Sequence, residues 1–317
     1  MAIDRDVAAR LRLFDGMTYA DVAAGSERLA DAVRAFSAPV GGYRSPAVEV
    51  GEERLPGPHG DVRVRLYRPP SQRSDPGAGL VWVHGGGFRG GDLDMPEADA
   101  VAREVCVQAA ATVVSVEYRL AVDGVHYPVP LDDVVAAWLG VVERCAPLGI
   151  NAGRLALGGA SAGGNLAAGA TLRLRDAGGP LPSRLILAYP LLHRRLPPAA
   201  DPLPADVERL PPVMRFPPSA LAEMTANYLG SNAPDAYAFP ALGTFDRFPA
   251  TTIVTSEYDD LRVSGEAFAA RLRAAGVAVS LRREPGVPHG HLNVPGLSGW
   301  RRSVRAISAE TAARPPR

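Results

Sequence analysis

The chain has 317 residues, of which 47% are hydrophobic, and its 34 basic and 34 acidic side chains give a formal net charge of zero. This length suits one large α/β domain with an addition, or two smaller domains. A zero net charge gives no electrostatic reason to expect nucleic acid or an anionic membrane as a partner. The sequence lacks both a run of about 20 apolar residues and the apolar core of a signal peptide, so we expect a cytoplasmic protein without a membrane span.

Taken in chain order, the elements begin with residues 7–36, whose apolar side chains recur at helical spacing and predict one or two amphipathic helices. Segments 48–50 and 62–67 alternate with period two and predict half-exposed antiparallel strands. Dense apolar runs, which predict parallel strands buried on both faces, follow at 80–83, 112–116, 154–157, 185–189 and 252–255. Helical stretches lie between them, near 94–110, 130–145 and 162–176. This alternation predicts an α/β fold with a doubly wound, mostly parallel sheet.

The alternation stops between Tyr189 and Ala250. Six prolines stand in the segment from Pro197 to Pro212, both included, and a helical pattern follows at 219–229. A proline-rich stretch of this length inside an α/β domain is either a disordered loop or an insertion with a role of its own.

One motif joins a predicted strand to a predicted helix. Gly159-x-Ser161-x-Gly163 follows the strand at 154–157 and precedes a helix start at Asn165. The spacing and the context are those of a nucleophile elbow, in which a sharp turn exposes the serine Oγ. The flanking glycines allow neighbouring elements to approach closely.

A second motif, His-Gly-Gly-Gly-Phe at 84–88, directly follows the strand at 80–83. Glycines at a strand end leave backbone N–H groups open to an anion, which an ester carbonyl needs when it becomes a tetrahedral oxyanion. A phosphate-binding loop would need a lysine, and the chain contains none. The dinucleotide fingerprint Gly-x-Gly-x-x-Gly at the start of a helix is also missing.

Three motifs follow one another along the chain: His-Gly-Gly-Gly at 84–87, Glu-Tyr-Arg-Leu-Ala at 117–121, and Gly-x-Ser-Ala-Gly-Gly-Asn-Leu-Ala at 159–167. In these motifs and in their order, the chain resembles the hormone-sensitive-lipase-like branch of the α/β-hydrolases, chiefly its bacterial carboxylesterases. The similarity extends from about residue 47 to about 308. It implies an α/β-hydrolase fold with a helical cap, a Ser-Asp-His triad, a small-molecule ester substrate, and neither metal nor organic cofactor. The cap would comprise 1–45 and 193–232, and the core 46–192 and 233–317. The family includes monomers and dimers, so either a monomer or a homodimer is expected.

The nucleophile Ser161 needs a base, and that base needs an orienting acid. The family pattern of a histidine, a glycine and an aromatic residue assigns the base to His289. His291 takes the place of the aromatic residue and is the alternative base. We otherwise expect its imidazole to line the pocket or lie on the surface, with roles in tuning His289 or in binding substrate left open. Asp259 matches the first residue of the family's Asp-Pro-Leu-Arg-Asp pattern. Asp260 replaces the proline and is an alternative acid or a helix N-cap.

The remaining assignments concern the oxyanion hole and the pocket. The resemblance implies backbone N–H donors at Gly86 and Gly87, and the place after the nucleophile adds Ala162. His84 is expected to fix the glycine loop, and Glu97 to lie solvated on a charged helix face. The expected pocket lining, whose members could instead be core residues, is Phe88, Met214, Phe216, Met224, Tyr228, Phe239 and His291.

Alternatives remain open at this level. The same triad could act on amides, carbamates or acetylated groups. A hydrolase fold that only binds a ligand is a second class, although the presence of His289 argues against it. The usual Asp of the elbow is replaced by Ala160, which removes no reacting group.

Overall fold

The structure is a computed structural model and describes residues 2–18, 21–22, 25–70 and 75–314. Within these residues, eight strands form one sheet in the order β1-β2-β4-β3-β5-β6-β7-β8. Their bounds are β1 Glu49–Leu55, β2 Val62–Arg68, β3 Gly77–Val83, β4 Thr112–Glu117, β5 Ile150–Ala160, β6 Leu185–Ala188, β7 Thr251–Tyr258 and β8 Val279–Pro288. β2 pairs antiparallel with β1 and β4, and the other neighbours are parallel. The predicted fold class is therefore confirmed.

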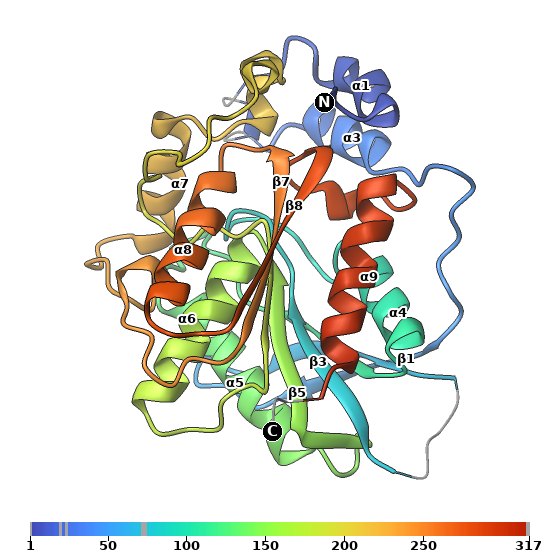
Figure 1. The fold of residues 1–317 in the computed structure, drawn as a ribbon, viewed down its shortest axis with the longest axis vertical. Coiled ribbons are helices and arrows are strands. Elements are labelled where there is room, and N and C mark those ends of the chain that lie inside the picture. The colour runs from blue at the N-terminus through green and yellow to red at the C-terminus, as the bar shows by residue number, and fades with distance from the viewer. Residues whose placement is uncertain (1, 19–20, 23–24, 71–74, 315–317) are drawn as a thin grey trace.

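Helices cover both faces of the sheet (Figure 1). Those that flank it are α4 Asp99–Gln108, α5 Val129–Glu143, α6 Ala162–Asp176, α8 Arg262–Ala274 and α9 Ser298–Ala312. Buried side chains of α5, α6 and α8 belong to one hydrophobic cluster, and those of α4 and α9 to another. The sheet is thus the middle layer of three.

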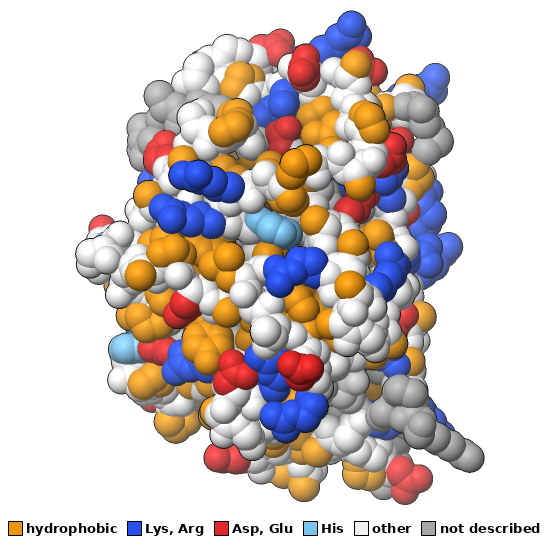
Figure 2. All heavy atoms as spheres, turned by 60° about the vertical axis from the view of Figure 1, so that its left-hand side comes forward, with side chains coloured by type: hydrophobic (Ala, Val, Ile, Leu, Met, Phe, Trp, Pro, Cys, Tyr) orange, Lys and Arg blue, Asp and Glu red, His pale blue; other side chains and the backbone are white. Residues whose placement is uncertain are grey.

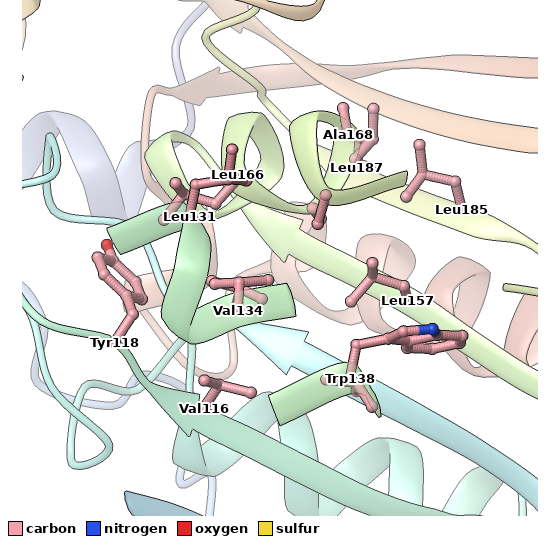
Figure 3. Close-up of a cluster of buried hydrophobic side chains, with 14 of the residues drawn as sticks. Val116, Tyr118, Leu131, Val134, Trp138, Leu157, Leu166, Ala168, Leu185 and Leu187 are labelled. Atoms are coloured by element: carbon pink, nitrogen blue, oxygen red, sulfur yellow. The ribbon is translucent and has the colours of Figure 1, made fainter. Parts of the chain in front are cut away.

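The alternation of side chains along the strands explains these two clusters. In β3, Val81 and Val83 face the first cluster, whereas Leu80 and Trp82 face the second, because successive side chains point to opposite faces. All four are fully buried. Figure 3 shows the first cluster, with Trp138 and neighbouring aliphatic side chains packed between the sheet and its helices. Dense apolar runs therefore formed the central strands, as predicted.

The carboxyl ends of the parallel strands lie along one edge of the sheet, where the loops after β3, β5, β7 and β8 begin. In open α/β sheets this edge is where ligands bind. The remaining helices are α1 Arg5–Arg10, α3 Glu27–Phe36 and α7 Pro218–Leu229, and the 3₁₀ turns are η1 Leu11–Phe14, η2 Ala205–Arg209, η3 Pro212–Met214, η4 Pro240–Leu242 and η5 His291–Asn293. Figure 1 shows α1 and α3 above this edge, at the end of the molecule to which β7 and β8 point.

One predicted helix is shorter than its pattern. The stretch near 94–110 becomes helical only at Asp99, because Pro96 lacks an N–H and restricts the residue before it. The residues before Asp99 form turns instead, and they bring Glu97 into the interior.

The surface agrees with the balanced composition. On the face drawn in Figure 2, acidic and basic side chains are interspersed with apolar ones. Among the residues described, no helix is both long enough and apolar enough to cross a membrane.

Candidate active site

Ser161 lies between the end of β5 and the start of α6, as the elbow motif predicts. Its backbone has φ +52° and ψ −115°, a region that costs a non-glycine residue roughly 1–3 kcal/mol. A Cβ atom on Gly163 would lie 2.2 Å from the carbonyl oxygen of Val83, so only glycine lets α6 start this close to β3. The serine side chain is thereby held at the edge of the sheet, and the residue is 8% exposed.

Three side chains from three loops form a continuous hydrogen-bond chain. His289 Nε2 lies 2.9 Å from Ser161 Oγ, and His289 Nδ1 lies 2.8 Å from Asp259 Oδ2. Because an ionised carboxylate only accepts, Nδ1 donates to Asp259, and Nε2 accepts from the serine hydroxyl. The other carboxylate oxygen of Asp259 accepts from the N–H of Leu261 at 2.8 Å. Both oxygens of this buried carboxylate are therefore engaged.

Asp260 faces the opposite way. Its carboxylate accepts from Arg215 Nε at 2.7 Å, from Arg215 Nη2 at 3.0 Å and from the N–H of Phe216 at 2.7 Å. The N-cap of α8 is Leu261, without a side-chain hydrogen bond at the cap. Both alternatives for Asp260, triad acid and helix N-cap, are therefore wrong. It instead joins the end of β7 to the proline-rich segment.

The His-Gly-Gly-Gly loop has left-handed backbone angles at Gly86, Gly87 and Phe88, with φ of +113°, +62° and +66°. A Cβ atom on Gly86 would lie 2.0 Å from the carbonyl oxygen of Gly90. Among the residues that the structure describes, none accepts a hydrogen bond from the N–H of Gly86 or Gly87. The N–H of Ala162, in the first turn of α6, also lacks an intrahelical acceptor.

His84 supports this loop as expected. Its Nδ1 lies 2.7 Å from the carbonyl oxygen of Gly85, and its ring stacks on Tyr118 with the centroids 4.4 Å apart. Burial lowers the pKa of His84, so its imidazole is neutral and Nδ1 is the donor.

A cavity of about 1030 Å³ opens beside His289. Of the predicted lining residues, Met214 and Phe216 line it. Sequence reasoning did not assign to the pocket the side chains that the N-terminal segment contributes, namely Phe14, Val22, Leu29, Val33 and Phe36. Their helical spacing was visible in the sequence, but it indicated only packing.

Four of the predicted lining residues have no exposed surface: Phe88, Tyr228, Phe239 and His291. Phe88 stacks on Tyr228 with the ring centroids 3.8 Å apart, so this aromatic pair attaches the glycine loop to α7. These residues belong to the core, and the pocket prediction is wrong for them. Met224 borders a smaller cavity together with Phe216, and its Sδ would lie 3.5 Å from a Cβ atom placed on Gly87.

His291 is neither at the surface nor in the pocket. Its Nδ1 lies 2.9 Å from Ser256 Oγ, and its Nε2 lies 2.8 Å from Ser303 Oγ. Burial lowers the pKa of His291 to about 3, so the ring is neutral. It contacts Tyr189, whose ring in turn contacts His289.

Glu97 is another residue that sequence reasoning placed wrongly. It is 1% exposed rather than solvated, and its carboxylate accepts from the N–H of Gly85 at 2.6 Å and from the hydroxyl of Tyr189 at 2.7 Å. No motif or spacing identified it, because its partners are distant in the sequence.

Metal-ligating clusters and cysteine thiols are the other groups with binding chemistry to consider. The described residues contain no group of three or more His, Cys, Asp or Glu side chains that could hold a metal ion. Cys106 and Cys145 are buried free thiols.

Known proteins share this architecture. A family model described as alpha/beta hydrolase fold matches residues 80–293. Carboxylesterase NlhH of Mycobacterium tuberculosis is 39% identical over 251 residues, which cover 76% of this chain and 75% of that protein. The ethyl acetate hydrolase of Pseudomonas putida is 36% identical over 239 residues, 71% of this chain and 70% of that protein. A solved structure titled Bacterial Heroin Esterase superimposes with a TM-score of 0.82 and 28% identity, covering 100% of this chain and 99% of that one. The chain therefore belongs to the hormone-sensitive-lipase-like carboxylesterases of the α/β-hydrolase superfamily.

Proposed function

We propose that this protein hydrolyses carboxylic esters with short to medium acyl chains, through a covalent acyl-enzyme on Ser161. The observation that carries the proposal is the hydrogen-bond chain from Ser161 through His289 to Asp259. A serine hydroxyl is a poor nucleophile near neutral pH, and this arrangement supplies the base and the orienting acid that it needs.

The proposed mechanism uses each group in turn. His289 Nε2 takes the proton of Ser161 while Oγ attacks the ester carbonyl carbon. Asp259 keeps the imidazole in the required tautomer and stabilises the imidazolium. The protonated His289 then gives its proton to the leaving alcohol, and afterwards it activates the water that releases the carboxylic acid.

The negative charge that develops on the carbonyl oxygen needs donors. We assign the backbone N–H groups of Gly86, Gly87 and Ala162 to this role, because the described structure leaves them without an intramolecular acceptor. The loss of one such donor costs about 3–4 kcal/mol of transition-state stabilisation.

The substrate class rests on the cavity. We propose that 1–45 and 193–232 form the cap over 46–192 and 233–317. Both cap segments line the cavity with apolar side chains, among them Phe36 and Phe216. A mostly apolar, open cavity of about 1030 Å³ has room for both halves of a small ester.

The test is the hydrolysis of p-nitrophenyl esters from acetate to decanoate. We expect turnover to peak at short to medium chains and to fall at least about 10⁴-fold in Ser161→Ala. Ser219→Ala, an exposed serine on α7, is the matched control and should keep full activity. A folded wild type without turnover on any ester would overturn the proposal and favour an amide or carbamate substrate, or a ligand-binding role.

A further inference from the structure

Glu97 is a buried acid that the mechanism above does not use. Its Oε1 accepts from the N–H of Gly85 at 2.6 Å. Its Oε2 accepts from the hydroxyl of Tyr189 at 2.7 Å and from Asn293 Nδ2 at 3.1 Å. The backbone of Glu97 adds two bonds, since its carbonyl oxygen accepts from Trp82 Nε1 at 2.8 Å and its N–H donates to Asn293 Oδ1 at 3.3 Å.

Both side-chain oxygens of Glu97 act as acceptors in this set, as those of a carboxylate do. Three hydrogens point at the two side-chain oxygens, and a glutamine would present one oxygen and a donor NH₂ group instead. No basic side chain forms an ion pair with Glu97 among the residues described by the structure. Burying a charge without a cation is costly, and three hydrogen bonds from neutral donors are the compensation that the fold provides.

The first of these donors belongs to the proposed oxyanion loop. Gly85 lies between the carboxylate and the nucleophile: a Cβ atom on Gly85 would be 2.6 Å from Glu97 Oε1 and 3.3 Å from Ser161 Cβ. Gly86 and Gly87 follow directly. The bond from Gly85 to Glu97 therefore sets how close these two amides come to the carbon that Ser161 attacks.

The other two donors belong to the side of the site that holds the base. Burial raises the pKa of Tyr189 well above its ordinary value, so its hydroxyl stays protonated and donates to Glu97. The ring of Tyr189 meets that of His289 edge-on, with the centroids 4.9 Å apart. Asn293 is four residues beyond His289 and bonds Glu97 through both of its amide atoms. One carboxylate thus joins the loop of the oxyanion donors to the loop of the base.

We propose that Glu97 is a positioning residue, which holds the oxyanion loop in register with Ser161 and His289. The inference rests on the proposed function, since it concerns the same reaction. Without the carboxylate, Gly85 loses its acceptor and the amides of Gly86 and Gly87 move relative to the tetrahedral oxygen. Because that oxygen is charged only in the transition state, the loss should appear in kcat and not in KM.

The decisive variant is Glu97→Gln, which keeps the shape but has a single acceptor oxygen, so it cannot accept from both Gly85 N–H and Asn293 Nδ2, and the two loops are no longer joined. Glu104→Gln is the matched control, since it removes the same charge from α4, where the Glu104 carboxylate accepts from Gln108 Nε2 at 2.7 Å. The assay uses p-nitrophenyl butyrate, with active sites counted by fluorophosphonate labelling of Ser161. We expect kcat per labelled site to fall about 10- to 100-fold in Glu97→Gln, with KM within about twofold. The inhibition constant of phenylboronic acid, which forms a tetrahedral adduct, should rise by a similar factor.

A merely structural role would lower the number of labelled sites and leave kcat per labelled site unchanged; this result overturns the proposal. If Glu97→Gln does not fold, Tyr189→Phe tests the proposal in its place, because it removes one hydrogen-bond donor to Glu97 and keeps the Glu97 carboxylate. We then expect kcat per labelled site to fall about 3- to 10-fold, the effect of one hydrogen bond, and an unchanged value overturns the proposal.

Failure of the proposed function is a separate result. If the wild type hydrolyses no ester but Ser161 is labelled, the substrate class is wrong. The rate of labelling then tests Glu97 in the same variants, since phosphonylation uses the same serine, base and loop. A labelling rate that is unchanged in Glu97→Gln overturns the inference.

Discussion

The catalytic edge of the sheet and the proposed cap are built in different ways. At the edge, buried side chains bond each other directly, as in the chain from Ser161 through His289 to Asp259. In the cap, arginines bond backbone carbonyl groups: Arg10 Nη1 donates to Phe36 O at 2.7 Å, and Arg262 Nη2, from the core, donates to Pro202 O at 2.8 Å. The side chains of Ser161, Asp259 and His289 therefore follow the ends of strands, whereas the cavity walls are held by arginine side chains together with apolar packing, as between Phe14 and Phe36.

Two neighbouring aspartates show this difference at a single turn. Asp259 is 1% exposed and bonds His289, and Asp260 is 8% exposed and bonds Arg215 of the proposed cap. We expect Asp259→Asn to lower kcat about 10⁴-fold, because His289 then loses the acceptor that fixes its tautomer. Asp260→Asn keeps the triad and should lower kcat less than about 10-fold. Turnover of p-nitrophenyl acetate per labelled site measures both, and equal losses would contradict the separation of the two regions.

The pH dependence of stability tests the buried environment of His291. The pKa of this imidazole is about 3 in the folded protein because burial opposes its charge, against an ordinary value of 6.5. At pH values between these two, the unfolded chain binds more protons than the folded protein does. The free energy of unfolding therefore falls as the pH decreases from about 6.5, and this group causes little loss above that pH. From pH 7 to pH 5 the wild type should lose about 2 kcal/mol through this group.

His291→Phe removes that contribution. Urea unfolding at the two pH values should show that the variant, although less stable at pH 7, loses about 2 kcal/mol less on acidification. His193, whose pKa burial lowers to about 4, adds a loss of the same sign in both proteins and cancels in the difference. An equal loss in wild type and variant would refute the assignment.

The smallest expected effect concerns the cap. Arg215→Ala removes two of the three hydrogen bonds of Asp260 and loosens the segment that presents Met214 and Phe216 to the cavity. We expect KM for p-nitrophenyl butyrate to rise about 3- to 10-fold with kcat nearly unchanged, because the triad is untouched. Arg209→Ala, an exposed arginine of the same segment, is the control. A fall in kcat instead would show that the cap also positions the reacting groups.

The sequence alone predicted seven of the eight strands and, through the family resemblance, the side chains of the proposed triad. Buried strands appear as dense apolar runs, and in a parallel sheet their carboxyl ends meet at one edge. A glycine-flanked serine and a glycine loop after two such strands therefore lie together by topology. Ser161 was assigned from its local motif, and Asp259 and His289 from the patterns of the family that the chain resembles; the structure brings the three within hydrogen-bond distance.

Only the tertiary structure decided the environments of the other polar residues. Glu97 and Tyr189 are 92 positions apart, and Arg215 and Asp260 are 45 apart, so no local spacing connects them. His291 stands two residues from the base, yet its partners Ser256 and Ser303 come from β7 and α9. Burial of a polar side chain depends on donors and acceptors that the fold supplies from elsewhere, whereas strand formation depends on neighbours along the chain.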